Sequence, residues 1–373
     1  MRDADMESGA QRHGRVGSVI NGKWQIDARV GAGGMAAVYA ATHRNGSRAA
    51  LKILHAPLSI DPQVRARFLR EGRVANSVGH PGVVPVLDDG VTEDGAAFLV
   101  LELLEGETVE ARRLRLGGVL PIDEALDVAE ASLDVLAAAH ARGVIHRDVK
   151  PENVFFTKER EIKLLDFGLA RLKDGQDATQ TGVRIGTPEF MSPEQAGGRR
   201  DAVDARSDVW GVGAMLFTMI TGRFVHETAQ SLREQLLVNA TQRPRSILDV
   251  MPDVPPAVAV VIDRALELER SDRWQSARDM QLGLRAARAS RERAHATDDA
   301  LGSGLWESPT VVSERRPPVL LPSPAPTADG PAFDEAVDCE TTVVDRGQAA
   351  PPEPNPLPSR PSPASVAKDA GVE

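Results

Sequence analysis

Three polar side chains within residues 144–168, Asp148, Asn153 and Asp166, have the types and spacing that phosphoryl transfer requires. Asn153 and Asp166 offer an amide and a carboxylate oxygen. These suit Mg2+, because this ion binds one or two such protein oxygens and otherwise keeps waters and nucleotide phosphates. Asp148 is then free to act as a general base.

Two short apolar runs, residues 154–156 and 162–165, predict a β-ribbon that returns the chain after this polar loop. A hairpin of this size brings Asn153 and Asp166 close together. The elements around the three polar residues therefore predict a metal site at the open end of a ribbon, with Asp148 beside it.

The motif HRDVKPEN at residues 146–153, followed by DFG at residues 166–168, resembles the catalytic loop and the metal loop of a protein kinase. Lys150, two residues after Asp148, is similar to the lysine of serine/threonine kinases that touches the transferred phosphate. The resemblance implies an α+β, two-lobed protein kinase fold with a small β-rich N-lobe and a larger helical C-lobe. It also implies ATP and Mg2+, with Mn2+ as an alternative, and it makes Asp148, Lys150 and Asn153 catalytic.

A glycine-rich turn, GAGGMAAVY at residues 31–39, follows a predicted strand at residues 24–30. Such a turn lets backbone N–H groups approach phosphate oxygens without a side chain in the way. A dinucleotide-binding fold would place a helix directly after the glycines, but here a second strand follows. The glycine pattern alone is therefore weak evidence for any one nucleotide-binding fold.

Residues 49–54, AALKIL, resemble the third strand of the kinase small lobe, whose lysine, Lys52 here, holds the α and β phosphates. By the same resemblance Val38 and Ala50 pack on the two faces of the adenine. Ala36 departs from the family, which has a third glycine there, and we expect its methyl group at the loop tip to cause at most a modest loss. The other residues of the predicted ATP site are Val30, Gly31, Gly33, Glu102, Leu104 and Asp166.

Residues 61–79 predict a helix with apolar residues on one face. The resemblance makes Glu71, in the middle of this helix, the partner that holds Lys52 on the phosphates. Gly72 beside it is unusual, since glycine inside a helix costs about 1 kcal/mol relative to alanine. We expect it to leave the helix mobile until a contact clamps it.

Residues 96–104 predict a buried strand that ends in a hinge, where the backbone of Glu102 and Leu104 would meet the adenine and Leu101 would guard the pocket behind it. Residues 121–141 predict the clearest helix of the chain. His140 in this helix, and His146 in the catalytic loop, are interpreted as structural residues rather than ligands.

Residues 169–184 predict a mobile segment rich in Gly, Asp, Thr and Gln. Thr179 and Thr181 in this segment are the candidate phosphorylation sites. A phosphate on either would join Arg147 and Arg171 in a basic pocket and help to seat the glutamate of the 61–79 helix.

The block GTPEFMSPEQ at residues 186–195 resembles the substrate platform of bacterial serine/threonine kinases. The resemblance implies that Thr187 bonds near the catalytic base and that Glu194 pairs with Arg273. It also implies that Asp208, at the start of a helix, anchors the backbone of the catalytic loop. A lone aspartate there would otherwise be a helix N-cap.

The composition limits the classes of partner and compartment. The chain has 373 residues, a net charge of -10 and a single cysteine, Cys339. The acidic balance argues against nucleic acid as a main partner, because phosphate backbones need a basic face. One cysteine excludes an internal disulfide framework. The absence of a long apolar run and of a signal-like N-terminus predicts a cytoplasmic protein without a membrane span.

The composition also predicts three segments. Residues 1–20 form a disordered lead, residues 21–290 the kinase domain (N-lobe 21–103, C-lobe 104–290), and residues 291–373 a disordered, Pro/Ala-rich tail, because about half of the prolines lie there. The arginine-rich run near residue 290 is interpreted as a solvated helix face or, less favoured, as a surface for an acidic partner.

Two β-branched islands interrupt the tail, around Thr310 and around Thr341 and Thr342. Forkhead-associated domains bind a phosphothreonine together with the residue three positions on, and Thr342 with Asp345 has that spacing. A partner of this kind and an inert spacer both remain open.

Together these patterns predict a serine/threonine protein kinase that transfers the ATP γ-phosphate to protein hydroxyls, phosphorylates itself and acts in bacterial signal transduction. The alternative is a pseudokinase scaffold that binds ATP and partners without phosphotransfer. A small-molecule phosphotransferase is a third reading, which the Lys150 and Thr187 platform disfavours. The sequence indicates neither the substrates, the activating signal nor the oligomeric state.

Overall fold

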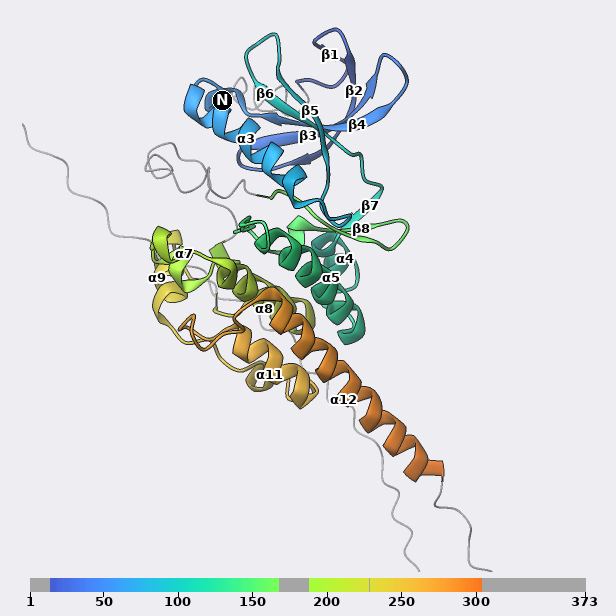
Figure 1. The fold of residues 1–373 in the computed structure, drawn as a ribbon, viewed down its shortest axis with the longest axis vertical. Helices are drawn as coiled ribbons and strands as arrows, with labels where there is room; N and C mark the ends of the chain where they lie inside the picture. The colour runs from blue at the N-terminus through green and yellow to red at the C-terminus, as the bar shows by residue number, and fades with distance from the viewer. Residues whose placement is uncertain (1–13, 168–187, 228, 304–373) are drawn as a thin grey trace, which may run out of the picture. The chain divides into compact units, whose positions relative to one another are not determined.

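A six-stranded antiparallel sheet, in the order β1-β2-β3-β4-β6-β5, forms the N-terminal part of the fold (Figure 1). The computed structural model describes residues 14–167, 188–227 and 229–303. The strands of this sheet are β1 (Val19–Ile20), β2 (Trp24–Ala32), β3 (Ala36–His43), β4 (Arg48–Leu54), β5 (Val86–Val91) and β6 (Ala97–Leu101).

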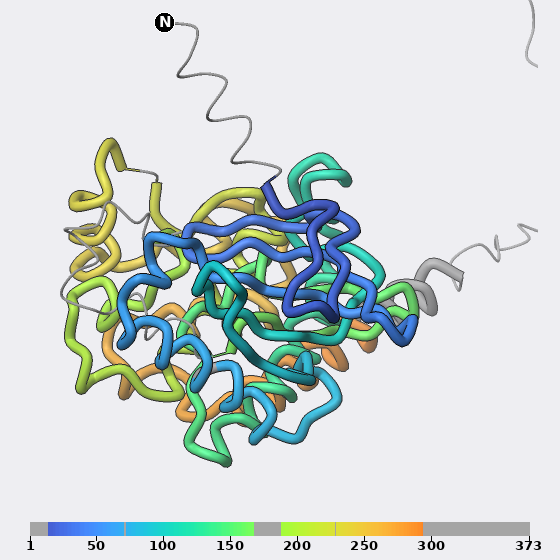
Figure 2. Tube along the Cα trace, turned by 90° about the horizontal axis from the view of Figure 1, so that it is seen from above, coloured from blue at the N-terminus to red at the C-terminus, as the bar shows by residue number. Residues whose placement is uncertain are grey.

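Helix α3 (Pro62–Val78) packs along this sheet, as the view from above shows (Figure 2). The sequence defines both of its ends. Asp61 caps the N-terminus by accepting a hydrogen bond from the Gln63 backbone N–H, and Gly79 ends the helix in the left-handed region at φ 61°. A short helix, α2 (Ala56–Ser59), precedes it.

A second, three-stranded sheet lies where the chain enters the helical part of the fold. Its strands are β7 (Gly106–Thr108), β8 (Val154–Thr157) and β9 (Ile162–Leu164), and all its pairs are antiparallel. Pairing of β8 with β9 forms the ribbon that the sequence predicts. The Leu165 backbone N–H donates to the Asn153 carbonyl over 2.8 Å, so the open end of the ribbon is closed.

Helices and their connecting loops make up the rest of the described chain, and α5, α8, α11 and α12 lie side by side (Figure 1). The α-helices of this part are α4 (Val109–Arg115), α5 (Ile122–His140), α7 (Pro193–Ala196), α8 (Ala205–Thr221), α9 (Leu232–Thr241), α10 (Ile247–Val250), α11 (Pro256–Ala265) and α12 (Ala277–Ser303). The 3-10 turns are η1 (Pro151–Asn153), η2 (Pro188–Phe190) and η3 (Arg200–Ala202).

The main core centres on α8, which is buried on every side from Ser207 to Ile220. Trp210, Met215 and Phe217 are among its fully buried side chains. A helix that is apolar all round belongs inside a protein rather than on its surface. The core therefore gives α8 a fixed position from which polar side chains at its N-terminus can hold neighbouring loops.

Both ends of the domain extend beyond the predicted limits. Residues 14–20, which the sequence assigns to a disordered lead, are part of the structure, because β1 pairs with β2 and the Gly17 N–H donates to the Ile26 carbonyl. At the other end α12 continues to Ser303, past the predicted boundary at residue 290. Composition misses the first segment because β2, not the segment's own sequence, gives it a pairing partner, and in the second segment Arg291 pairs with Asp123 of α5.

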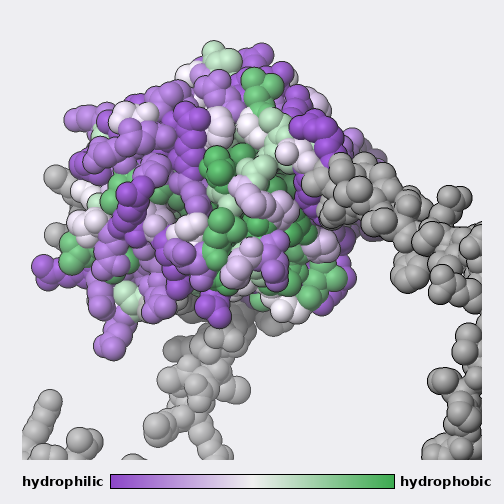
Figure 3. All heavy atoms as spheres, turned by 90° about the horizontal axis from the view of Figure 1, so that it is seen from below, coloured by the Kyte–Doolittle hydropathy of each residue, from purple (hydrophilic) through white to green (hydrophobic). Residues whose placement is uncertain are grey.

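The surface on the face seen from below is mostly hydrophilic and includes a smaller hydrophobic area (Figure 3). Among the residues that the structure describes, no helix is both long and apolar enough to cross a membrane.

Candidate functional site

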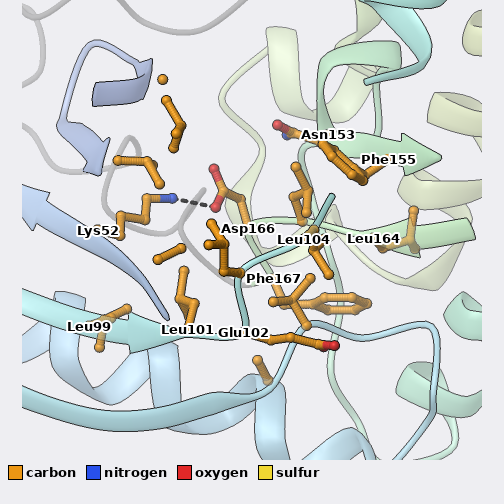
Figure 4. Close-up of a pocket in the computed structure, with 18 of the residues that line it drawn as sticks. Lys52, Leu99, Leu101, Glu102, Leu104, Asn153, Phe155, Leu164, Asp166 and Phe167 are labelled. Carbon is orange, nitrogen blue, oxygen red and sulfur yellow. Dashed lines mark hydrogen bonds and ion pairs between the residues drawn. The ribbon is translucent and has the colours of Figure 1, made fainter. Parts of the chain in front are cut away.

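A pocket of about 490 Å3 lies between the six-stranded sheet and the small sheet (Figure 4). This volume is within the usual range for small-molecule sites, about 300–1,000 Å3. The predicted residues that line it are Val30, Gly31, Val38, Ala50, Lys52, Glu102, Leu104, Asn153 and Asp166. The pocket has mostly apolar walls and a few polar groups at one end. Such a lining suits a flat heterocycle that carries a charged extension.

The apolar walls differ from the prediction in one respect. Val38 pairs with Lys52 across the β3–β4 ladder, and Ala50 precedes Lys52 by two residues on β4. All three side chains therefore project from one face of the sheet. Val38 and Ala50 thus line the same wall, and Phe155 and Leu164 of the small sheet line the pocket too (Figure 4). The prediction that Val38 and Ala50 enclose a ring between them is wrong, because strand pairing puts them on one side.

Lys52 and Asp166 form an ion pair at the polar end of the pocket (Figure 4). Lys52 is only 7% exposed. Lysine is rarely buried without a partner, and here Asp166 is that partner. Asp166 has φ 61°, a left-handed conformation that is uncommon for residues other than glycine. Glu71 lies in α3, but its side chain is outside the described part of the structure, so its pairing with Lys52 stays a prediction.

The catalytic-loop residues are held together by short contacts. The Asn153 side-chain amide donates to the Asp148 backbone carbonyl over 2.7 Å and to its carboxylate over 3.1 Å. Lys150 Nζ lies 3.2 Å from the same carboxylate. The structure therefore brings Asp148, Lys150 and Asn153 together, and the closed ribbon end joins them to Asp166.

Asp208, buried at the start of α8, binds the backbone of this loop. Its carboxylate accepts hydrogen bonds from the N–H groups of His146, over 2.8 Å, and Arg147, over 2.7 Å. His140 Nε2 lies 2.7 Å from the same carboxylate. Arg147 has φ 69°, so this contact also holds a residue in a backbone conformation that costs energy.

His146 connects the loop to the segment that follows the ribbon. Its Nε2 lies 2.8 Å from the Leu165 carbonyl oxygen, and its ring meets Phe167 edge-on at 4.6 Å between centroids. The side chain is fully buried. His140 and His146 thus each have a structural partner, the Asp208 carboxylate and the Leu165 carbonyl oxygen respectively.

Glu194 and Arg273, which the sequence predicts as partners, form a buried bidentate ion pair with both distances 2.9 Å. Ser207 also donates to Glu194, over 2.6 Å. Burial alone raises the pKa of Glu194, but the bonds from Arg273 and Ser207 outweigh it, so the pKa lies below its ordinary value. The pair fixes α7 to the segment before α12.

The glycine-rich turn leads from β2 into β3. Gly31 lines the pocket, whereas Gly33 is outside its lining and donates its N–H to the Ala36 carbonyl over 2.9 Å. Ala36 is the first residue of β3 and packs in a small apolar cluster with Leu54 and Phe68. The Ala36 methyl group therefore faces the protein core rather than the loop tip, and the expectation of at most a modest loss stays a prediction.

The residues at the polar end fit a nucleotide with a divalent cation. Asp166 and Asn153 present one carboxylate and one amide, the number of protein oxygens that Mg2+ accepts when phosphates and waters supply the rest. Lys52 adds a positive charge within the same pocket. Within the described residues no group of three or more His, Cys, Asp or Glu could bind a metal by itself. The donor set thus suits a metal that arrives with a phosphate ligand.

Several predicted residues lie outside the described ranges. These are Arg171, Thr179, Thr181 and Thr187, and in the tail Thr310, Thr341, Thr342 and Asp345. Their predicted roles remain predictions.

Phe155 and Gln195 are two of the contributors that the sequence reasoning missed. Phe155 lines the pocket, and its position in the β-strand after Asn153 indicates it, because alternate strand residues share a face. Gln195 donates to the Arg147 carbonyl over 2.7 Å and so connects α7 to the catalytic loop. The sequence gives no local signal for that contact, since 48 residues separate the two.

Comparison with known proteins gives matches over most of the described chain. The protein kinase domain family matches residues 24–282. Serine/threonine-protein kinase Pkn1 of Myxococcus xanthus is 35% identical, over 79% of this chain and 44% of that protein. PknA of Mycobacterium tuberculosis is 34% identical, over 74% of this chain and 64% of that protein.

Solved structures agree with these matches. The crystal structure of the Mycobacterium tuberculosis PknI kinase domain has 26% identity and a TM-score of 0.58, over 73% of this chain and 98% of that one. The chain spans less than two thirds of the length of the two sequence relatives.

Proposed function

Because the chain belongs to the protein kinase family, we propose that it is a non-specific serine/threonine kinase that transfers the γ-phosphoryl group of ATP to protein hydroxyls. The observation that carries the proposal is the joint placement of Asp148, Lys150 and Asn153 beside the Lys52–Asp166 pair. A pseudokinase scaffold is disfavoured, because each charged group that phosphotransfer needs is present.

In the proposed mechanism the chain's own residues position the reactants and move one proton. Asp148 accepts the proton of the attacking hydroxyl, and the Asn153 amide holds its carboxylate in place. Lys150 and Lys52 offset negative charge on the transferred group and on the nucleotide phosphates. Bound Mg2+ or Mn2+, held by Asn153 and Asp166, would shield the phosphate oxygens. The apolar walls take the adenine, and the backbone of Glu102 and Leu104 meets its edge.

The test is phosphotransfer by Asp148→Asn and Lys52→Met variants of the full chain, together with nucleotide affinity. We expect Asp148→Asn to lower kcat by about 10²-fold or more with ATP affinity nearly unchanged, because the base does not hold ATP. Lys52→Met should reduce both quantities. Asp253→Asn, at an exposed position, is the matched control. Near-normal turnover of Asp148→Asn would exclude the assigned base, and an inactive wild type that still binds ATP would favour the scaffold.

Activation is proposed to depend on Thr179 and Thr181. A phosphate on either would form charge-assisted hydrogen bonds with arginines such as Arg147 and order the segment that carries it. Replacing both threonines with alanine should lower activity toward a peptide severalfold. Unchanged activity, after mass spectrometry has found phosphate on the wild-type threonines, would contradict this role.

Protein substrates, a cytoplasmic location and a tail partner are further parts of the proposal. Thr342, with Asp345 three residues on, would bind a forkhead-associated domain once phosphorylated. A synthetic tail peptide with phosphothreonine at position 342 should capture such a domain, whereas the unmodified peptide should not. Equal capture of both forms would leave the tail as a spacer.

A further inference from the structure

A buried glycine lies in the middle of α3, directly after Glu71. Glycine weakens a helix interior because it has the greatest backbone freedom to lose. Gly72 is also one of the residues that line the pocket. Its cost to the helix therefore needs a compensating reason, and the packing around it supplies one.

A side chain at position 72 requires either α3 or the Leu99 side chain to shift. A Cβ atom there would lie 2.7 Å from both methyl carbons of Leu99 and 3.3 Å from its Cγ. Carbon atoms pack best at about 3.5–4.0 Å. The missing side chain thus lets α3 approach β6 about 1 Å closer than alanine would.

Leu99 has little freedom to move aside. It is 3% exposed and packs in an apolar cluster that includes Leu54 and Phe68. It also lines the inner end of the pocket (Figure 4). A rotation away from α3 would carry its methyl groups toward the cluster or into the pocket.

Leu99 also lies directly opposite Lys52 in the sheet. The two residues are direct partners in the β4–β6 ladder. Directly opposed residues in an antiparallel pair share one face of the sheet. The contact between Gly72 and Leu99 thus sets the distance of α3 from the sheet beside Lys52.

Polar contacts hold α3 against the neighbouring strand. Arg73, the next residue, binds both carboxylate oxygens of Asp89 on β5, over 3.0 and 2.9 Å. One turn further on, the Asn76 side chain donates to the Val86 carbonyl over 2.7 Å and accepts from its N–H over 2.8 Å. These contacts connect α3 to β5 just after the Gly72 position, so a shift of α3 away from the sheet would strain them.

We propose that Gly72 is a positioning residue for the proposed phosphotransfer. Its missing side chain sets α3 at the distance from β6 at which residue 71 can reach Lys52, while Leu99 stays out of the pocket. The inference rests on the proposed function and on the predicted Glu71–Lys52 pair.

The test is a double-mutant cycle in the full chain, with kcat, KM for ATP and the melting temperature measured for each variant. Gly72→Ala should lower kcat/KM for ATP by about 10- to 100-fold, because a misplacement of about 1 Å has effects of that size. Leu99→Ala removes the three atoms that would clash. The combined variant should therefore recover activity to within about threefold of Leu99→Ala alone.

Ala66→Gly, at an exposed position of the same helix, is the matched control. It should lower the melting temperature and leave kcat/KM unchanged, which separates helix stability from positioning. Wild-type activity in Gly72→Ala, or losses that multiply in the combined variant, would overturn the inference.

If the wild type proved inactive, the proposed function would be contradicted, but the positioning role of Gly72 could still be tested. The two measurements that then test this role are a crystal structure of the Gly72→Ala variant and the affinity of this variant for ADP. The expected result is a shift of α3 from β6 by about 1 Å, or Leu99 turned into the pocket, with weaker ADP binding. An unchanged α3 and Leu99 with unchanged ADP affinity would exclude the positioning role.

Discussion

At the residue scale, buried charges explain how the site is supported. Glu194 and Arg273 are 1% and 0% exposed. Arg273 also donates to the backbone carbonyls of Glu267, over 2.7 Å, and Leu268, over 3.0 Å, and its guanidinium lies over the Trp210 ring. Each charge thus has several partners, as a buried ion needs in order to offset its lost hydration.

Glu194→Gln should destabilise the fold by about 3–5 kcal/mol at neutral pH, because it leaves Arg273 buried without its counter-charge. The pKa of Glu194 is lowered in the fold, so its ionised form stabilises the native state above its ordinary value of 4.5. That stabilisation is lost as the pH falls through the lowered pKa. Urea unfolding from about pH 7 to below pH 4.5 should show a constant difference from wild type that narrows only in acid.

Glu269→Gln, at an exposed position near the same segment, is the control and should unfold as the wild type does. Equal stability of Glu194→Gln and wild type at neutral pH would show that the buried pair contributes nothing. A difference that grows in acid would contradict the direction of the pKa shift.

At the element scale, local signals predict the elements well. The Asp61 cap and Gly79 limit α3 to within one residue of the predicted helix. The apolar period of α5 and the two runs of the β8–β9 ribbon likewise predict these elements. Local hydrogen bonding and side-chain period determine such features, so a single sequence contains them.

Register and packing are less accessible to sequence reasoning. The side of the pocket on which Val38 lies depends on its pairing with Lys52, 14 residues further along the chain. The direction of the Ala36 methyl group depends on a cluster that includes Phe68 and Leu99. Such contacts join distant segments, and no local pattern indicates them. Gly72 shows the same limit. The sequence indicates that this glycine destabilises the helix, but only its contact with Leu99 explains why a glycine is there.

At the scale of the whole molecule, α12 shows how a basic run can serve the chain itself. Arg285 pairs with Glu130 of α5 over 2.6 Å, and Arg288 pairs with Asp127 over 2.6 Å. Arg291 pairs with Asp123, which also lies in α5. The acidic partner of these arginines is therefore α5. The prediction of a solvated helix face fits part of this run, since Arg285 is 47% exposed, but it misses the pairing with α5, because composition does not indicate which helix lies beside the run.

This arrangement predicts how the chain responds to shortening. A chain that ends at residue 303 should unfold as the full chain does. Ending at residue 290 removes the Arg291 ion pair, and exposed pairs contribute about 0–1 kcal/mol. The melting temperature should then fall by about 2–4 °C or less. Added salt should reduce this difference, since it screens exposed charges.

Ending at residue 283 should have a far larger effect, because Leu284 and Ala287 are buried in the core. Loss of one buried leucine alone costs about 2–5 kcal/mol.

Thermal melts of the three shortened chains, at low and high salt, measure both effects. Arg291→Gln in the full chain is the matched control for the ion pair. If the 290 and 283 chains melted together, the packing of residues 284–290 would contribute no stability. If Arg291→Gln had no effect while the 290 chain lost several degrees, the helix beyond residue 290 would stabilise the domain through contacts other than this pair.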